Sequence, residues 1–371
     1  MKRIMGIINL SERTEHIKEL TLNRAIASLP FAGRYRVIDF ALSNMVNSRI
    51  DNVAVVTQGK TRSLVDHLGS GKPWDLNRNR DGLFIFHPDV SSQDVVQRKG
   101  DMEIFKENLD YLYRSKEEYV AMSRSYMIGV VDYENIMAYH EDRGADITIV
   151  YSKVMNGSDF MYCDTVLVGN NHEIRSIGKN MSKEKEVDIS MEMYFMKREL
   201  LITIIEDAIQ TGDSDHLKQC IFNRLTNMKV YGYRHYGYVA CINSLPNYYK
   251  ASMDMLHQDI YSELFRSERL IYTKVKNEPP AKYTNTSIVE NSLIGSGCVI
   301  KGTVINSVIA RGVVVEENAV VKNSIIMQNA NIAATSDLNY MIIDKNVTIS
   351  AEKRLNGDVN HPYVVKKNAV L

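Results

Sequence analysis

Residues 308–332 read VIARGVVVEENAVVKNSIIMQNANI, and this stretch decides the fold of the last part of the chain. β-Branched residues recur at every sixth position, without a helical period. Such a period is typical of a left-handed parallel β-helix, whereas ordinary antiparallel strands would not maintain an unbroken run of sixes. Before and after this stretch the six-residue period continues, but in a shifted frame. We expect these residues to point inward: Ile288, Ile294, Ile300, Val308, Val314, Val320, Ile326, Ile332, Ile343 and Ile349.

The preceding part of the chain has a different pattern, in which short apolar runs alternate with helical ones. This alternation predicts an α/β fold with a doubly wound, mostly parallel sheet. Ligands of such sheets bind beyond the carboxyl ends of the strands. We expect strands over residues 4–8, 53–56, 119–122 and 147–151, and helices over residues 35–48, 105–113 and 133–142.

A third segment lies between these two patterns. It combines a helical run rich in Tyr and Met with Glu278-Pro279-Pro280, where two prolines stiffen the backbone. We therefore divide the chain into an α/β domain over residues 1–246, a linker over 247–282 and a β-helix over 283–371.

Composition limits the partners that the chain can have. Lys plus Arg and Asp plus Glu each total 45, so the net charge gives no reason to expect nucleic acid or an anionic membrane as a partner. Cys163, Cys220, Cys241 and Cys298 lie far apart without a CxxC motif, which indicates reduced thiols and no zinc site. No segment approaches the length of a membrane span, so we expect a cytoplasmic protein.

Several strings carry a resemblance to a known family. Residues 30–44 read PFAGRYRVIDFALSN and resemble the PFGGKYRIIDFPLSN run of ADP-glucose pyrophosphorylases. VTQ at 56–58, PPAK at 279–282 and IIDK at 342–345 also resemble strings of that family. The likeness covers nearly the whole chain. The sequence thus resembles the bacterial glucose-1-phosphate adenylyltransferase family, in particular its GlgD-type subunits, which implies a nucleotidyltransferase-like first domain.

The phosphate-binding loop of that family is altered in this chain. The family pattern is roughly LAGGxGxRLxxLT, whereas residues 9–21 read NLSERTEHIKELT. Ser11, Glu12 and Thr14 stand where the resemblance places glycines, and His16 stands where it places an arginine. Glycine lets backbone N–H groups approach nucleotide phosphates closely. We therefore expect this segment to be a surface loop that binds no triphosphate.

The positions that would serve catalysis are altered as well. Ile26 replaces a lysine that the resemblance places near the reacting phosphates. Tyr126 and Cys241 replace the two aspartates that hold magnesium in the family. Mg²⁺ prefers oxygen ligands, usually carboxylates, and neither neutral side chain substitutes for them. We therefore expect no catalytic residue, no metal and no cofactor in this chain, and place Mg²⁺ in a catalytic partner.

Basic and polar residues remain in regions that the resemblance assigns to the effector or sugar-phosphate sites. Arginine forms bidentate contacts with phosphate groups. Structural salt bridges are the alternative role for the arginines, and plain solvation is the alternative for the lysine at 179. The candidate contacts are Arg24, Arg34, Arg36, Gln58, Lys60, Arg62 and Lys179.

The resemblance and the lost positions lead to one preferred function and two alternatives. We expect a regulatory subunit that pairs with a catalytic glucose-1-phosphate adenylyltransferase subunit in a mixed tetramer, supporting ADP-glucose synthesis from ATP and glucose 1-phosphate for glycogen. One alternative is an active sugar-1-phosphate nucleotidyltransferase with a rearranged metal site, for which Glu103 is the candidate carboxylate. The other is an acyltransferase on the β-helix, disfavoured because residues 284–351 contain no histidine to act as a base.

Overall fold

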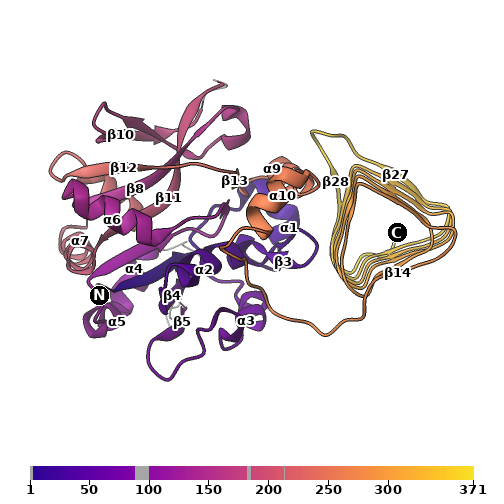
Figure 1. Ribbon diagram of the computed structural model, residues 1–371, viewed down its shortest axis with the longest axis horizontal. Coiled ribbons are helices and arrows are strands. Elements are labelled where there is room, and N and C mark those ends of the chain that lie inside the picture. The colour runs from indigo at the N-terminus through magenta and orange to yellow at the C-terminus, as the bar shows by residue number, and fades with distance from the viewer. Residues whose placement is uncertain (1–2, 88–99, 182–184, 213) are drawn as a thin grey trace. The chain divides into compact units, whose positions relative to one another are not determined.

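The computed structural model describes residues 3–87, 100–181, 185–212 and 214–371 (Figure 1). The chain forms two compact units that do not follow chain order. One unit contains residues up to Glu12 together with Phe40–Cys241, and the other contains Arg13–Asp39 together with Ile242–Leu371. The chain therefore passes between the units after Glu12, after Asp39 and after Cys241.

A mixed sheet forms the centre of the first unit. Its strand order is β10-β9-β11-β6-β1-β4-β5, and β8 pairs with β11 and with β12. Strands β6, β1, β4 and β5 are parallel, whereas β11 runs antiparallel to β6, β8 and β9. The strands are β1 Ile4–Asn9, β4 Asn52–Val56, β5 Gly82–Phe86, β6 Tyr119–Ser123, β8 Ile147–Val154, β9 Asp164–Val168, β10 Ile174–Lys179, β11 Val187–Lys197 and β12 Val230–His235. A short pair, β7 Met127–Ile128 and β13 Ala240–Cys241, lies outside this sheet.

The expected strands at 4–8, 53–56, 119–122 and 147–151 are confirmed by β1, β4, β6 and β8. The expected helix at 105–113 is broken in two, because the backbone of Asn108 leaves the helical conformation. Asp132 caps the helix that follows β7 by accepting hydrogen bonds from two backbone N–H groups. The helices are α2 Val37–Asn47, α3 Arg62–Leu68, α4 Asp101–Glu107, α5 Leu109–Arg114, α6 Tyr133–Arg143, α7 Arg198–Thr211 and α8 Leu217–Asn223.

The C-terminal part of the second unit is the expected left-handed parallel β-helix, which appears as a three-sided coil in Figure 1. Each side is a parallel sheet of five strands. The first side contains β14 Lys282–Tyr283, β17 Val299–Ile300, β20 Val314–Val315, β23 Asn331–Ile332 and β26 Thr348–Ile349. The second contains β15 Ile288–Glu290, β18 Thr303–Ile305, β21 Val320–Lys322, β24 Asp337–Asn339 and β27 Arg354–Asn356. The third contains β16 Leu293–Ile294, β19 Val308–Ile309, β22 Ile325–Ile326, β25 Met341–Ile343 and β28 Tyr363–Val365.

The inward frame of the β-helix differs in part from the expected one. Ile300, Ile326, Ile332, Ile343 and Ile349 are fully buried, as predicted. Val308 is buried as well, but the expected frame through it, Val314 and Val320 is wrong by one residue, because Ile309, Val315 and Val321 form the core of the β-helix there. Ile288 is also outside the core, with half of its surface exposed. Strands β19, β20 and β21 each carry two adjacent aliphatic residues, and the period alone does not decide which one points inward.

Two helices and an N-terminal segment complete the second unit. Helices α9 Leu245–Asp254 and α10 Gln258–Phe265 lie within the expected linker. The Tyr248 hydroxyl donates to the carbonyl of Pro30 at 2.7 Å, and the Tyr249 hydroxyl donates to that of Asn323 at 2.6 Å. The N-terminal segment contains α1 Lys18–Thr21 and the hairpin of β2 Pro30–Phe31 and β3 Tyr35–Arg36, so the helix expected at 35–48 begins after β3. Within the described residues, no helix is both long and apolar enough to cross a membrane.

Candidate functional site

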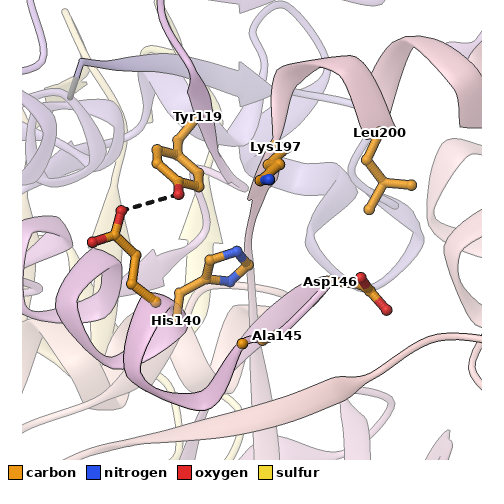
Figure 2. A pocket seen from close by; sticks show the side chains of 8 residues that line it. Tyr119, His140, Ala145, Asp146, Lys197 and Leu200 are labelled. Atoms are coloured by element: carbon orange, nitrogen blue, oxygen red, sulfur yellow. Dashed lines mark hydrogen bonds between the residues drawn. The ribbon is translucent and has the colours of Figure 1, made fainter.

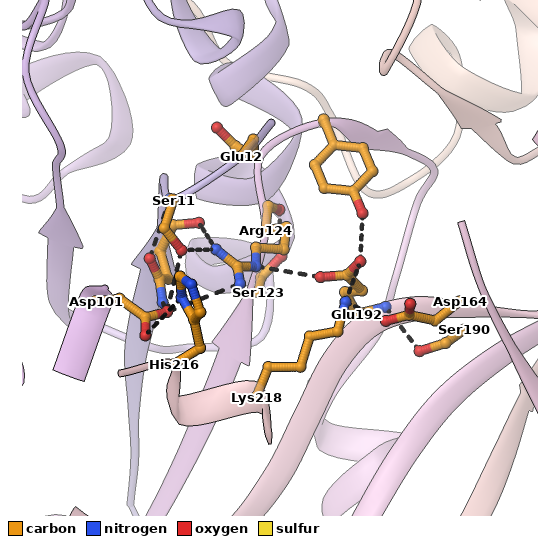
Figure 3. A network of polar contacts seen from close by, with 12 residues as sticks. Ser11, Glu12, Asp101, Ser123, Arg124, Asp164, Ser190, Glu192, His216 and Lys218 are labelled. Carbon is orange, nitrogen blue, oxygen red and sulfur yellow. Dashed lines mark hydrogen bonds and ion pairs between the residues drawn. The ribbon is translucent and has the colours of Figure 1, made fainter. Parts of the chain in front are cut away.

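The altered loop begins at the carboxyl edge of the central sheet. Strands β1 and β6 are parallel neighbours, Ser11 and Glu12 follow the first, and Arg124 follows the second. These side chains therefore meet where ligands of such sheets usually bind. Figure 3 shows them within one network of polar contacts that also contains Asp101, Asp164, Glu192 and Lys218.

Asp101 is the buried acid on the β1 side of this network. Its carboxylate accepts hydrogen bonds from the Asn9 amide at 2.6 Å, the Ser11 hydroxyl at 3.0 Å and the Leu217 backbone N–H at 2.8 Å. Burial opposes ionisation, but a hydrogen bond from His216, the charge of Arg124 and these donors lower the pKa of Asp101 to about 2. Ser11 is thus a hydrogen-bonding member of the network.

Glu12 places a negative charge on the turn that follows β6. Its carboxylate accepts hydrogen bonds from the Ser125 backbone N–H at 2.9 Å and from the Ser125 hydroxyl at 2.7 Å. Burial raises the pKa of Glu12, against the effects of Ser125 and of the Arg124 charge. A carboxylate of the protein therefore occupies donors that could otherwise contact an anionic ligand.

Arg124 is almost fully buried and is held entirely by protein groups. Its guanidinium lies 3.2 Å from the Glu192 carboxylate and 3.8 Å from that of Asp101. It also donates to the Ser11 hydroxyl, and at 3.4 Å to the Asn9 carbonyl. The negative charges of Glu192, Asp101 and Glu12 therefore neutralise this cation.

Glu192 links Arg124 to a second cation, Lys218. The Lys218 ammonium lies 3.0 Å from Glu192 and also pairs with Asp164, whose other oxygen lies 2.5 Å from Lys179. Burial opposes the change, but the charges of Lys218 and Arg124 lower the pKa of Glu192. Lys179, expected to contact a sugar phosphate, is therefore the last residue of a series of ion pairs that runs from Arg124 through Glu192, Lys218 and Asp164.

Tyr126 and Cys241 occupy the positions where the family resemblance places metal-binding aspartates. The Tyr126 hydroxyl donates to Glu192 at 2.5 Å, and burial together with the charge of Glu192 raises the pKa of that phenol. The Cys241 thiol lies 3.1 Å from the Cys163 thiol. In the part of the chain that the structure describes, no three His, Cys, Asp or Glu side chains are placed to hold a metal ion. These residues do not fit the magnesium that the family resemblance implies.

The other altered positions belong to the second compact unit. Thr14 precedes a short 3-10 helix at Glu15–Ile17, in which His16 is exposed. Ile26 begins another, at Ile26–Ser28, and its side chain is fully buried. Ile26 is therefore an apolar core residue of its unit.

The second unit contains a cluster of cations around Lys345. Arg24 is buried and pairs with Asp344 at 2.7 Å. Burial, together with the nearby charges of Arg36 and Arg24, lowers the pKa of Lys345 to about 7. Such crowding of positive charge indicates a place where an anion would be stabilised. Sequence reasoning matched the 342–345 string but gave Lys345 no role.

The remaining predicted contacts lie elsewhere. The Arg34 guanidinium lies over the Tyr35 ring, 5.3 Å from its centroid. Burial lowers the pKa of Arg311, and the positive charge of Arg34 lowers it further. Gln58, Lys60 and Arg62 are exposed in the first unit, after β4 and at the start of α3. The structure thus groups Arg24 and Arg36 with Lys345, and assigns Gln58, Lys60, Arg62 and Lys179 to the other unit.

A separate cavity of about 400 Å³ lies in the first unit, and several of its lining side chains are drawn in Figure 2. Tyr119 begins β6 and Asp146 precedes β8, so the cavity opens at the amino ends of these strands. The Tyr119 hydroxyl donates to Glu141 at 3.0 Å, and burial lowers the pKa of His140 to about 4. Its position is opposite to the edge where sheets of this kind bind ligands.

An α/β sheet with its polar network at the carboxyl edge, in a chain that also contains a hexapeptide β-helix, defines a protein of the nucleotidyl transferase class. A family profile for nucleotidyl transferases matches residues 14–240, and a profile for the GlmU-like C-terminal hexapeptide region matches residues 279–362.

Individual relatives narrow this class. The chain is 33% identical to the glycogen biosynthesis protein GlgD of Bacillus subtilis (strain 168) over 368 residues, which cover 99% of the chain and 97% of the relative. It is 37% identical to the GlgD protein of Geobacillus stearothermophilus over 86% of the chain and 83% of the relative. It is 31% identical to the glucose-1-phosphate adenylyltransferase of Lachnospira eligens over 85% of the chain and 75% of the relative. The chain belongs to the bacterial glucose-1-phosphate adenylyltransferase family and is of its GlgD type.

Proposed function

We propose that this chain is a regulatory subunit without catalytic activity of its own, which acts in the synthesis of ADP-glucose for glycogen. The names of the GlgD relatives and of the glucose-1-phosphate adenylyltransferases support a role in glycogen biosynthesis. One observation carries the rest of the proposal: the polar groups at the carboxyl edge of the sheet bond to each other. Glu12 occupies the donors of Ser125, and Arg124 is neutralised by three carboxylates.

Nucleotidyl transfer needs positive charge to stabilise the phosphoryl groups in the transition state. To bind a triphosphate, the pocket would have to release Arg124 from Glu192 and Asp101, and these two buried carboxylates would lose the cation that they share. An uncompensated buried charge typically costs about 3–5 kcal/mol. The network therefore supports a pocket that stays closed to nucleotide.

The partner in this proposal is a catalytic glucose-1-phosphate adenylyltransferase chain that holds the Mg²⁺, and the assembly is a mixed tetramer. The effector is a sugar phosphate that binds at Arg24, Arg36 and Lys345. The crowding of these cations supports that choice: burial and the charges of Arg36 and Arg24 lower the pKa of Lys345, and an anion would relieve the repulsion between the charges.

The alternative, an active nucleotidyltransferase with a rearranged metal site, needs carboxylates that are available to a metal. Asp101, Asp164 and Glu192 are committed to Arg124, Lys218 and hydrogen bonds. Glu103, the candidate carboxylate of this alternative, is half-buried on α4. These contacts favour the regulatory proposal.

The experiment is an assay of ADP-glucose formation by the purified chain, by a catalytic partner and by both together. We expect negligible turnover by the chain alone, and a changed maximal rate or effector response in the mixture. Magnesium-dependent turnover by the chain alone at ordinary enzymatic rates, roughly 1–10³ per second, would favour the alternative. A mixture that behaves like the partner alone would contradict the regulatory role.

A further inference from the structure

Two of the four cysteines meet in the first unit although 78 positions separate them in the chain. The Sγ atoms of Cys163 and Cys241 lie 3.1 Å apart, and both side chains are only 2% exposed. Both are free thiols in this structure. An S–S bond is about 2.05 Å long, so a movement of about 1 Å would bring the two sulfur atoms to bonding distance.

Hydrogen bonds of the backbone hold each cysteine in place. The Cys163 N–H donates to the Phe160 carbonyl at 3.1 Å, and the Cys163 carbonyl accepts from the Asn180 N–H at 2.8 Å. Cys241 ends β13 and pairs with Met127 of β7 in an antiparallel register. The approach of the thiols therefore follows from two fixed backbone segments, and not from one flexible side chain.

The other cysteines have different neighbours. The Cys220 thiol lies 3.8 Å from the Ser214 carbonyl, and the Cys298 thiol lies 3.0 Å from the Ala310 carbonyl. A carbonyl oxygen accepts a hydrogen bond from a thiol but cannot form a covalent bond with it on oxidation. These two residues therefore provide matched buried controls within the same chain.

We propose that Cys163 and Cys241 are a redox pair, which a small disulfide such as glutathione disulfide oxidises reversibly to an intramolecular disulfide. Cys241 stands where the family resemblance places a metal-binding aspartate. The position to which the resemblance assigns a ligand of a hard cation thus carries a thiol in contact with a second thiol.

The chemistry is thiol–disulfide exchange in two steps. The thiolate of one cysteine attacks a sulfur of glutathione disulfide, which forms a mixed disulfide and releases one glutathione thiolate. The thiolate of the second cysteine then attacks the protein sulfur and releases the other glutathione. Each glutathione thiolate takes up one of the protons that the two cysteines lose. The protein pair is oxidised by two electrons, and one glutathione disulfide is reduced to two glutathione molecules.

Access of the oxidant requires local opening, because both thiols are buried. Cys163 is the expected first nucleophile. It follows Tyr162, which is 49% exposed, and a short 3-10 helix at Gly157–Phe160 that lies between exposed residues. We therefore expect slow oxidation by glutathione disulfide, at a rate set by the opening of this turn.

The test uses the reduced full-length chain in native buffer with an excess of glutathione disulfide, followed by acid quenching, denaturation, alkylation and peptide mass mapping. We expect a linked peptide pair containing Cys163 and Cys241, and a fall in intact mass of about 2 Da for the two hydrogens lost. Cys220 and Cys298 should remain fully alkylated, and dithiothreitol should restore all four thiols.

Serine variants provide the control. C163S and C241S should each abolish the linked pair, and C220S should retain it. Mapping of the wild-type chain does not depend on how these variants fold. Four alkylated cysteines after prolonged exposure, a stable glutathione adduct without the internal link, or a link that forms only in denaturant would each overturn the proposal.

Discussion

The Glu12 carboxylate accepts two hydrogen bonds from Ser125, one from its backbone N–H at 2.9 Å and one from its hydroxyl at 2.7 Å. This contact joins the loop after β1 to the turn after β6, at the carboxyl edge where sheets of this kind bind ligands. Glu12 thus places a carboxyl group of the protein at this edge, and its protonation should affect stability.

Replacement of Glu12 by Gln should stabilise the chain at neutral pH. Burial raises the pKa of Glu12 in the folded state, so the folded chain binds this proton more tightly than the unfolded chain. The ionised carboxylate therefore costs stability as pH rises through the folded pKa. Gln keeps an acceptor oxygen for Ser125 without the charge. We expect E12Q to increase the free energy of unfolding by roughly 1 kcal/mol at pH 7, and urea titrations should show a smaller gain near pH 4.5.

The opposite result for E12Q would be informative. A loss of stability at pH 7 would mean that the attraction of Arg124 for the Glu12 charge outweighs its burial. Ser125→Ala is the matched variant, because it removes only the hydroxyl donor and keeps the backbone N–H.

Restoration of one metal-binding aspartate should destabilise the chain without creating activity. Tyr126→Asp replaces a hydroxyl that donates to Glu192 with a second buried carboxylate beside it. Repulsion and burial of the new charge should cost about 3–5 kcal/mol, whereas Tyr126→Phe should cost about 1 kcal/mol for the hydrogen bond alone. Urea unfolding of both variants compares these costs, and an ADP-glucose assay checks activity. Substantial turnover by Y126D would contradict our interpretation of the pocket.

The buried ion pairs should make stability depend strongly on acidic pH. The pKa of Asp101 falls from its ordinary value of 3.8 to about 2, and the charges of Lys218 and Arg124 also lower that of Glu192. A carboxyl with a lowered folded pKa contributes stability above its unfolded pKa and loses it as pH falls toward the folded value. We therefore expect the free energy of unfolding to decrease between about pH 4.5 and pH 2.

Lys218→Met tests how much Glu192 contributes to this loss of stability at acidic pH. It leaves Glu192 and Asp164 without their shared cation, so we expect a cost of about 3–5 kcal/mol at pH 7 and a smaller loss on acidification. Lys179→Met removes a partner of Asp164 that is 47% exposed and should cost at most about 1 kcal/mol. Equal effects of the two substitutions would show that Lys218 is not the central cation. Denaturant titrations across this pH range measure both.

The sequence predicted the architecture because hydrophobic period and strand alternation are local signals. It did not select the inward residue where two aliphatic residues are adjacent, as at Val314 and Val315. The ion-pair network could not be predicted from the sequence either, since Asp101, Glu192 and Lys218 come from three separate elements and form no motif. The same holds for Cys163 and Cys241, whose spacing gave no indication of contact. The family resemblance identified which positions had changed, but not which residues the new side chains contact.

The final prediction concerns the cations around Lys345. A bound sugar phosphate should favour the charged form of this lysine, because burial and the charges of Arg36 and Arg24 lower its pKa to about 7. The uncharged form therefore predominates above that pH, and effector binding should weaken as pH rises from about 6.5 to 8. Regulatory coupling is typically about 1–3 kcal/mol, which corresponds to a shift of roughly 5- to 150-fold in half-saturation.

Arg36→Ala and Lys345→Gln should each reduce this shift in mixtures with a catalytic partner, and K345Q should also flatten its pH dependence. Arg62→Ala is the control, because Arg62 is exposed in the other unit. The measurement is a titration of sugar phosphate against the rate of ADP-glucose synthesis at several pH values. If wild-type chain changes neither maximal rate nor half-saturation, the regulatory role is wrong. If it changes them while R36A and K345Q behave as wild type, regulation stands and the effector binds elsewhere.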